Sequence, residues 1–173
     1  MRLGNYCSRH YCIMSQMART QLINLLLLIL WLALIFFLSS EPSTASSVRS
    51  GTIVNAIHSI NPNYADVENI TFLVRKAAHI TAYFILGVLM FRVIRMFKLP
   101  SRKAVILSAA LVALYAITDE LHQLLVNGRS GEVRDVLIDT TAGALGVLVT
   151  FIIIRSYTLR RRSSPSQNYK NKV

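Results

Sequence analysis

Cysteines and acidic residues are scarce in this sequence, and so are charges of any kind. Only two of the 173 residues are cysteines, Cys7 and Cys12, and His10 lies between them. A structural zinc site needs four ligands, so we interpret the pair as free thiols in an N-terminal tail rather than as a metal centre or a disulfide. Eight acidic residues stand against 19 Lys and Arg, which gives a formal net charge of +11.

The low charge content goes with a high apolar content. Charged residues make up 16% of the chain and hydrophobic residues 53%, with a mean hydropathy of +0.46, which is too apolar for an ordinary soluble domain. The sequence also lacks a basic face with interleaved aromatic residues. Its Lys and Arg lie at the ends of apolar runs, as membrane-flanking anchors do, so we expect the lipid bilayer and no nucleic acid as a partner.

Four apolar runs approach the ~20 residues that a membrane-spanning helix needs. They predict transmembrane helices at about 21–39, 70–92, 103–126 and 134–155. The predicted fold class is therefore all-α, a polytopic membrane protein built as a bundle of four transmembrane helices. The alternative that the first run is a cleaved signal peptide is disfavoured, because its apolar core is long and it has no clean A-x-A site.

The membrane domain is expected to occupy residues 20–156, between an N-terminal tail at 1–19 and a basic tail at 157–173. Both termini are predicted to be cytoplasmic, because that orientation places most Lys and Arg inside. All eight acidic residues then fall toward the outside. The cations left outside are Arg49, Arg75, Lys76, Arg129 and Arg134.

Polar residues in the last three runs recur at helical spacing, so each run carries a polar stripe on one face. With a rise of ~1.5 Å per residue from the flanking cations, His79 lies about 20 Å above the cytoplasmic boundary, and Asp119 and Asp139 about 24 Å above it. Charged side chains at such depth must meet one another or water. The sequence therefore predicts one polar cluster, shared by three helices and open to the extracytoplasmic side. Gly143 and Gly146, on the face of Asp139, permit a neighbouring helix to approach closely.

The candidate site residues fall into three groups. The acid–base or catalytic candidates are His79, Asp119, Glu120, His122 and Asp139. The substrate-binding candidates are Arg75, Tyr83, Tyr115, Gln123 and Arg129. The candidates for a divalent metal, the one cofactor considered, are Asp135 and Asp139.

Each group has a structural alternative. Asp119 and His122, at i and i+3, suit an acid–base pair but equally a buried hydrogen-bond network. The G-x-x-x-D-x-x-x-D pattern ending at Asp139 echoes membrane CDP-alcohol phosphotransferases, yet the D-G-x-x-A-R half is absent. The alternative pairs Asp135 or Asp139 with a nearby cation as a lock between helices. Tyr83 and Tyr115 either floor a cavity or are packing residues with one hydrogen-bond partner. The cations considered for that lock are Arg75, Lys76, Arg129 and Arg134.

The loop arginine Arg129 suits a phosphate or carboxylate on a lipid-linked substrate, because guanidinium binds such groups in a bidentate manner. The alternative leaves it solvated or paired with Glu132. For Lys76 we favour a side chain that extends to the outer interface. No nucleophile elbow or S-x-x-K motif supports a serine nucleophile.

Three segments together resemble the VanZ-like family, which is named for an accessory protein of teicoplanin resistance. They are RKAAHITAYFILG at 75–87, YAITDELHQLLVNGRSGEVRDVLIDTTAG at 115–143 and, more loosely, FLSSEP at 37–42, and the resemblance covers roughly residues 20–155. Val126-Asn127 departs from the aromatic or branched residue and proline expected before the Gly-Arg. The resemblance implies a multi-pass bacterial cell-membrane protein linked to the envelope and, in its namesake, to glycopeptide resistance.

The leading hypothesis is a bundle with an outward-facing polar site for a lipid-linked or cell-wall component. One alternative is a metal-dependent membrane enzyme that acts on phospholipid or phosphoglycan headgroups. The other is a structural or partner-binding membrane protein without catalysis. The sequence leaves open whether the chain is an enzyme and whether it self-associates.

Overall fold

The computed structural model of the chain describes residues 4–42, 48, 51, 67–129 and 131–163. These residues form long helices, α1 (Gly4–Ser39), α3 (Val67–Ile94), α4 (Ser101–Gln123) and α5 (Val133–Ser163), with a short 3₁₀ helix η1 (Arg95–Phe97) after α3. Each long helix contains a stretch that is apolar and long enough to cross a membrane. The predicted all-α membrane bundle of four helices is confirmed.

The helix bounds differ from the predicted ones mainly at the two ends of the chain. Helix α1 already begins at Gly4, so its backbone is helical through most of the predicted N-terminal tail. Helix α5 continues to Ser163, beyond the predicted end near 155. The side chains of Cys7, His10 and Cys12, and the predicted tail from residue 164 onward, lie outside the described residues.

Turn residues set the connection between α3 and α4. Lys98 follows η1 in the left-handed conformation, with φ of 54°, and Pro100 precedes the first residue of α4. A left-handed residue ends a helix, and proline cannot continue one, so α3 stops here and α4 returns antiparallel beside it. At the other end of the bundle, Gly128 supplies a positive φ of 75° in the turn between α4 and α5.

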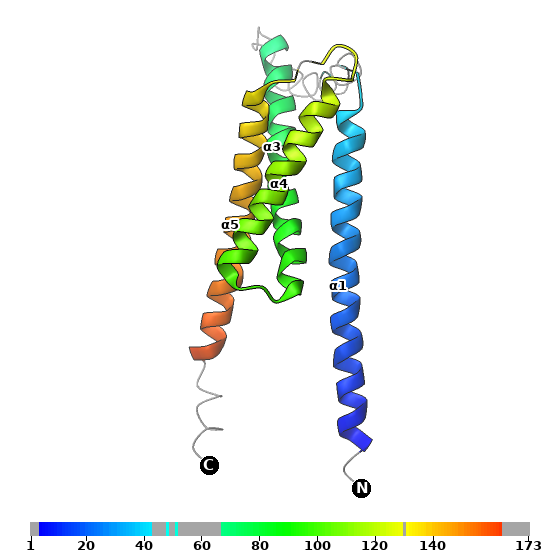
Figure 1. Ribbon diagram of the computed structural model, residues 1–173, viewed down its shortest axis with the longest axis vertical. Coiled ribbons are helices and arrows are strands. Elements are labelled where there is room, and N and C mark those ends of the chain that lie inside the picture. The colour runs from blue at the N-terminus through cyan, green and yellow to red at the C-terminus, as the bar shows by residue number, and fades with distance from the viewer. Residues whose placement is uncertain (1–3, 43–47, 49–50, 52–66, 130, 164–173) are drawn as a thin grey trace.

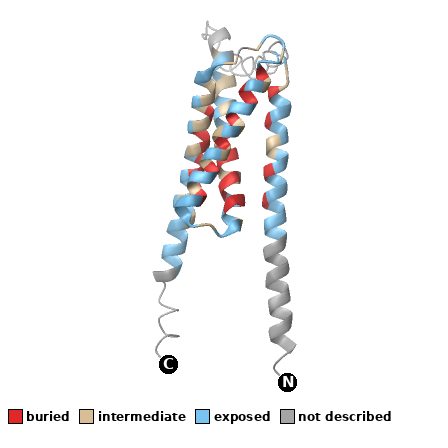
Figure 2. Cartoon of the chain, in the orientation of Figure 1, coloured by how far each residue is buried: buried red, intermediate tan, exposed pale blue. Residues whose placement is uncertain are grey.

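The core of the bundle lies between α3, α4 and α5, and the most extensive helix interface joins α3 to α5. Figure 2 shows the buried residues on the facing sides of these three helices, whereas α1 is largely exposed. Helix α1 lies along α3 and α4, where the indole Nε1 of Trp31 donates to the Ala82 carbonyl at 2.9 Å. The exposed leucines of α1 require lipid as their solvent, because a lone apolar helix would not stay in water.

Glycine permits the close contact between α3 and α5. A Cβ atom at Gly87 would lie 2.0 Å from the Gly143 carbonyl oxygen, and one at Gly146 would lie 2.1 Å from the Phe84 carbonyl oxygen. The two backbones therefore touch, as expected for small residues at membrane-helix interfaces. The predicted close approach at Gly143 and Gly146 is confirmed.

Helix α1 begins and helix α5 ends at the same end of the bundle (Figure 1). The acidic residues with described side chains lie toward the other end, just after α1, near the end of α4, just before α5 and in the first turns of α5. They are Glu41, Asp119, Glu120, Glu132, Asp135 and Asp139. Two predicted outer acids, Asp66 and Glu68, lie outside the described side chains.

Candidate functional site

The carboxylate of Asp119 joins three helices at the end of the bundle opposite the termini. Its Oδ2 accepts hydrogen bonds from Ser39 Oγ of α1 at 3.0 Å, Tyr83 OH of α3 at 3.0 Å and Gln123 Nε2 of its own helix at 3.1 Å. Asp119 is only 4% exposed. The hydrogen bonds from these donors offset the desolvation free energy of a carboxylate buried at this depth. The other oxygen, Oδ1, is buried without a hydrogen-bond partner.

Arg129 extends this network to the end of α1. Its Nη1 donates to Gln123 Oε1 at 3.0 Å, Nε donates to the Glu41 carbonyl at 2.9 Å, and Nη2 donates to the Leu38 carbonyl at 3.2 Å. The last carbonyls of a helix lack intrahelical donors and carry partial negative charge, so a cation here caps α1. The pKa of the Arg129 guanidinium is lowered, mainly by partial burial and to a smaller extent by repulsion from Arg75. The group remains a cation.

This arrangement differs from the predicted alternative in which Arg129 is solvated or pairs with Glu132. Three of its N–H groups are used on the neighbouring helices. The assignment of Arg129 to a substrate phosphate stays a prediction, because a guanidinium has five N–H donors.

Glu120, the residue next to Asp119, faces a different helix. Its Oε1 accepts the backbone N–H of Glu132 at 2.6 Å, immediately before α5 begins. The first N–H groups of a helix have no intrahelical acceptor, so Glu120 provides an anionic cap from another helix. The adjacent acids of the D-E pair thus hold α1 and α3 through Asp119, and the start of α5 through Glu120.

The predicted acid–base pair of Asp119 and His122 is not formed, since the structure has no hydrogen bond between these two described residues. His122 Nε2 lies 3.0 Å from Ser40 Oγ, and its ring stacks on Phe36 with 4.4 Å between centroids. Ser40 Oγ already donates to the Phe36 carbonyl at 2.7 Å, so its oxygen accepts and Nε2 of His122 carries the proton. The i, i+3 spacing places both side chains near α1, where Asp119 bonds Ser39 and His122 contacts Ser40.

Helices α3 and α5 are joined by two further polar pairs. Lys76 forms an ion pair with Asp135, and both side chains remain partly exposed. One turn farther along, His79 Nδ1 lies 3.5 Å from Asp139 Oδ2. Lys76, which was expected to extend to the outer interface, pairs with the carboxylate that the facing helix places within reach. The alternative of an interhelical lock at Asp135 is the one that the structure supports.

The two tyrosines each find one hydrogen-bond partner, as the packing alternative proposed. Tyr83 donates to Asp119, and Tyr115 OH donates to the Leu32 carbonyl of α1 at 2.7 Å. Tyr83 is fully buried. Helix α3 therefore contacts the acids of both neighbouring helices, Asp119 of α4 through Tyr83 and Asp139 of α5 through His79, which brings the three predicted polar stripes together.

The His and acidic side chains of this region do not form a set of ligands for a divalent metal. Among the described residues, no group of three or more His, Cys, Asp and Glu side chains converges on one point. The Asp135 carboxylate is taken by Lys76, and Asp139 has the His79 ring beside it. The predicted metal pair of Asp135 and Asp139 therefore does not fit a closed carboxylate site in this arrangement.

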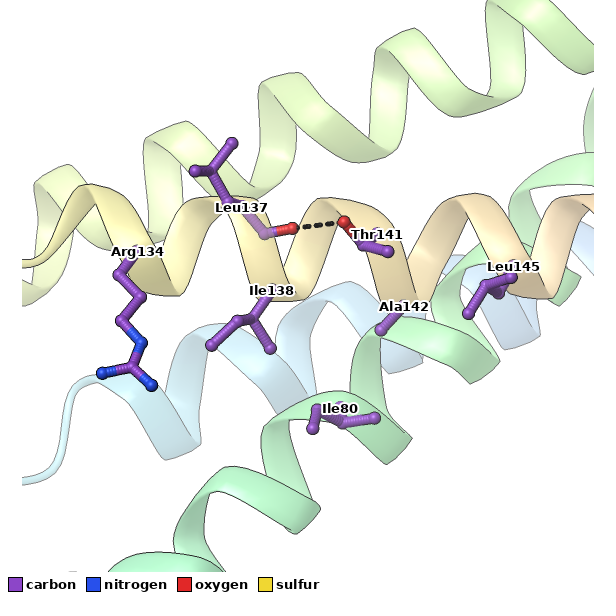
Figure 3. Close-up of a pocket in the computed structure, with 7 residues that line it drawn as sticks. All are labelled: Ile80, Arg134, Leu137, Ile138, Thr141, Ala142 and Leu145. Atoms are coloured by element: carbon purple, nitrogen blue, oxygen red, sulfur yellow. Dashed lines mark hydrogen bonds between the residues drawn. The ribbon is translucent and has the colours of Figure 1, made fainter.

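An apolar groove of about 390 Å³ runs beside the His79–Asp139 pair between α3 and α5. Figure 3 shows Ile138 and Ala142 of α5 turned toward Ile80 of α3, with the Arg134 guanidinium at one end. Ile80 and Ile138 are the chain neighbours of His79 and Asp139, so the groove and the polar pair lie side by side on the same two helices. The groove is thus apolar along its length and cationic at one end.

A comparison with protein-family models matches residues 24–155 to the VanZ/LLP1 family. The chain belongs to this family. No curated protein and no solved structure matches it. For a VanZ-like chain with four membrane-spanning helices, a multi-pass membrane location follows, and the resemblance noted in the sequence is confirmed.

The sequence prediction missed the contribution of α1 to this VanZ-like polar network. Ser39 and Ser40 reach Asp119 and His122, and Trp31 anchors α1 to α3. The available signal was the abrupt change from apolar residues to S-S-E at the end of the first run. That signal marked the helix end but could not show which later residues its hydroxyl groups would meet.

Proposed function

We propose that this VanZ-like protein lies in the bacterial cell membrane with both termini in the cytoplasm. Its polar end binds a lipid-linked envelope component with an anionic headgroup, and this activity contributes to glycopeptide (teicoplanin) resistance. The excess of Lys and Arg around the chain ends supports the orientation. Membership in the VanZ/LLP1 family supports the envelope role.

One observation carries the binding proposal. The His79 side chain is 26% exposed beside the buried Asp139 carboxylate, and the apolar groove runs along the same helices. A carboxylate beside an imidazole fixes the orientation of the ring, and an oriented ring N–H suits hydrogen bonding to a phosphate. The groove suits an apolar chain, and Arg134 at its end suits the headgroup charge.

The second candidate function is structural, and the bonding of Asp119 and Arg129 favours it. Their described partners belong to the bundle itself, on α1, α3 and α4. A protein with this role would present a rigid surface to another membrane protein and carry out no chemistry. The third hypothesis, a metal-dependent enzyme acting on phospholipid or phosphoglycan headgroups, has the least support, because Lys76 takes one of the two carboxylates.

The test is complementation of a deletion strain, with teicoplanin susceptibility and the envelope lipid profile as measurements. His79→Ala and Asp139→Asn are expected to abolish complementation while membrane abundance stays at the wild-type level. Thr118→Ala is the matched control, because that exposed hydroxyl bonds only the Tyr115 carbonyl of its own helix. If the two site variants fail to accumulate in the membrane, the structural role is the correct one.

A binding measurement separates ligand recognition from resistance. Full-length protein in nanodiscs is titrated with a polyprenyl phosphate as the lipid-linked probe. Arg134→Gln is expected to weaken binding about fivefold, since one basic group near a membrane surface contributes about 1 kcal/mol. Equal affinity for the probe and for the uncharged polyprenol would contradict the proposed recognition of an anionic headgroup.

A further inference from the structure

A second pocket opens at the end of the bundle where α1 begins and α5 ends. It has a volume of about 340 Å³ and lies where η1 and the start of α4 meet the last turns of α5. Its lining is Arg95, Ser101, Phe151, Ile154, Arg155, Thr158 and Leu159. None of these residues belongs to the polar network around Asp119, so the pocket is a separate feature of the fold.

The pocket holds two arginines without an acidic partner. Arg95 comes from η1 and Arg155 from α5, and neither pairs with a carboxylate among the described residues. The described acids lie toward the opposite end of the bundle. Both residues are exposed, and two guanidinium groups that line one cavity give it a positive potential, which attracts anions. Their N–H groups are therefore accessible to an anionic ligand.

The same pocket has an apolar side. Phe151 and Ile154 line it from α5, and the Arg155 guanidinium lies 5.9 Å from the centre of the Phe151 ring. A free inorganic anion would leave this apolar side empty, whereas a phospholipid would fill it with the first carbons of its acyl chains. The combination of paired guanidinium groups and an apolar wall favours an amphipathic anion.

The start of α4 adds hydrogen-bond donors beside the arginines. Ser101 is the first residue of this helix, and no side chain caps its N-terminus. The first backbone N–H groups of a helix are left without intrahelical acceptors and carry partial positive charge. They reinforce the preference for an anion that the two arginines already set.

We propose that this pocket binds the phosphodiester group of an anionic phospholipid from the membrane leaflet on the side of the termini. Arg95 and Arg155 donate to the phosphate oxygens from opposite walls, and Phe151 and Ile154 contact the glycerol and the acyl carbons. The bound lipid links η1 to α5, since each supplies one of the two cations. This site is independent of the proposed function at the other end of the bundle.

The experiment uses native mass spectrometry of the full-length protein, released from detergent with equal amounts of phosphatidylglycerol and phosphatidylcholine. The wild type is expected to retain one phosphatidylglycerol. Arg95→Gln combined with Arg155→Gln is expected to lower that affinity about 30-fold, because both basic groups that bind the phosphate are removed. The control combines Arg92→Gln with Arg161→Gln, which removes the same charge from exposed positions outside the pocket. It is expected to retain the lipid.

Two further measurements distinguish a phospholipid from free phosphate and test whether the variants still fold. Inorganic phosphate at millimolar concentration is expected not to displace the lipid, and displacement would overturn the lipid assignment. Arg95→Lys with Arg155→Lys keeps both charges and is expected to restore most of the retention. Equal weakening in the pocket and control variants would mean general surface attraction and would overturn the proposal, as would full retention in the glutamine pair.

Discussion

The hydroxyl group of Tyr83 in α3 donates a 3.0 Å hydrogen bond to the Oδ2 atom of Asp119 in α4. Both residues are buried, so this contact joins two helices in a region from which water is excluded. Tyr83→Phe removes the donor and keeps the ring. We expect it to lower the free energy of unfolding by about 1–2 kcal/mol, measured by denaturant unfolding in detergent micelles. The matched control is Tyr157→Phe, an exposed tyrosine near the end of α5. Equal effects of the two variants would rule out a special role for the Tyr83 hydroxyl.

Gly87 lies where α3 and α5 touch, and alanine has no space there. Its Cβ would approach the Gly143 carbonyl oxygen to 2.0 Å, so the helices must separate. We expect Gly87→Ala to destabilise the fold by about 1–3 kcal/mol and to reduce the yield of monodisperse protein. Gly51→Ala is the matched control, because a Cβ there meets nothing within 4 Å. If the Gly87→Ala variant is as stable as the wild type, the interface between α3 and α5 is looser than the structure shows.

The ion pair between Lys76 and Asp135 is suited to a double-mutant cycle. Lys76→Met, Asp135→Asn and their combination are compared by thermal unfolding in the same micelles. Because both side chains are partly exposed, we expect a coupling of about 0.5–1 kcal/mol rather than the larger value of a buried pair. Strictly additive effects would show that the two residues do not interact. Stoichiometric metal in the wild type that is absent from Asp135→Asn would instead revive the metal-site hypothesis.

Arg129 holds the end of α1 through acceptors that lie in different directions. Arg129→Gln is expected to destabilise the protein by about 1–2 kcal/mol, and Arg129→Lys is expected to recover little, because one ammonium group cannot reach all three acceptors. Limited proteolysis after α1 should accelerate in both variants. The control is Arg134→Gln, since Arg134 is exposed at the rim of the groove. If the Arg129→Gln variant is cleaved at the same rate as the wild type, Arg129 does not cap α1.

The polar cluster was predictable in outline, because the spacing of His79, Asp119 and Asp139 defines the helix faces and their depth. Individual partners were not. Lys76 was expected to extend outward, and it pairs with Asp135. The structural alternative for Arg129 was a solvated side chain or a pair with Glu132, and its guanidinium instead bonds the end of α1. His122 shares a face with Asp119 but contacts Ser40 and Phe36. Periodicity gives the direction of a side chain from its own helix axis and says nothing of the neighbour it meets.

The sequence by itself determined the class of fold, the membrane spans and the asymmetric charge of the two ends. These properties follow from local hydropathy, helical period and the composition of short segments. Only the tertiary structure decided that Asp119 and Glu120, adjacent in the chain, serve different helices, and that Arg129 caps α1. Such contacts depend on how helices distant in the sequence cross, and here glycine backbone contacts between α3 and α5 set that crossing.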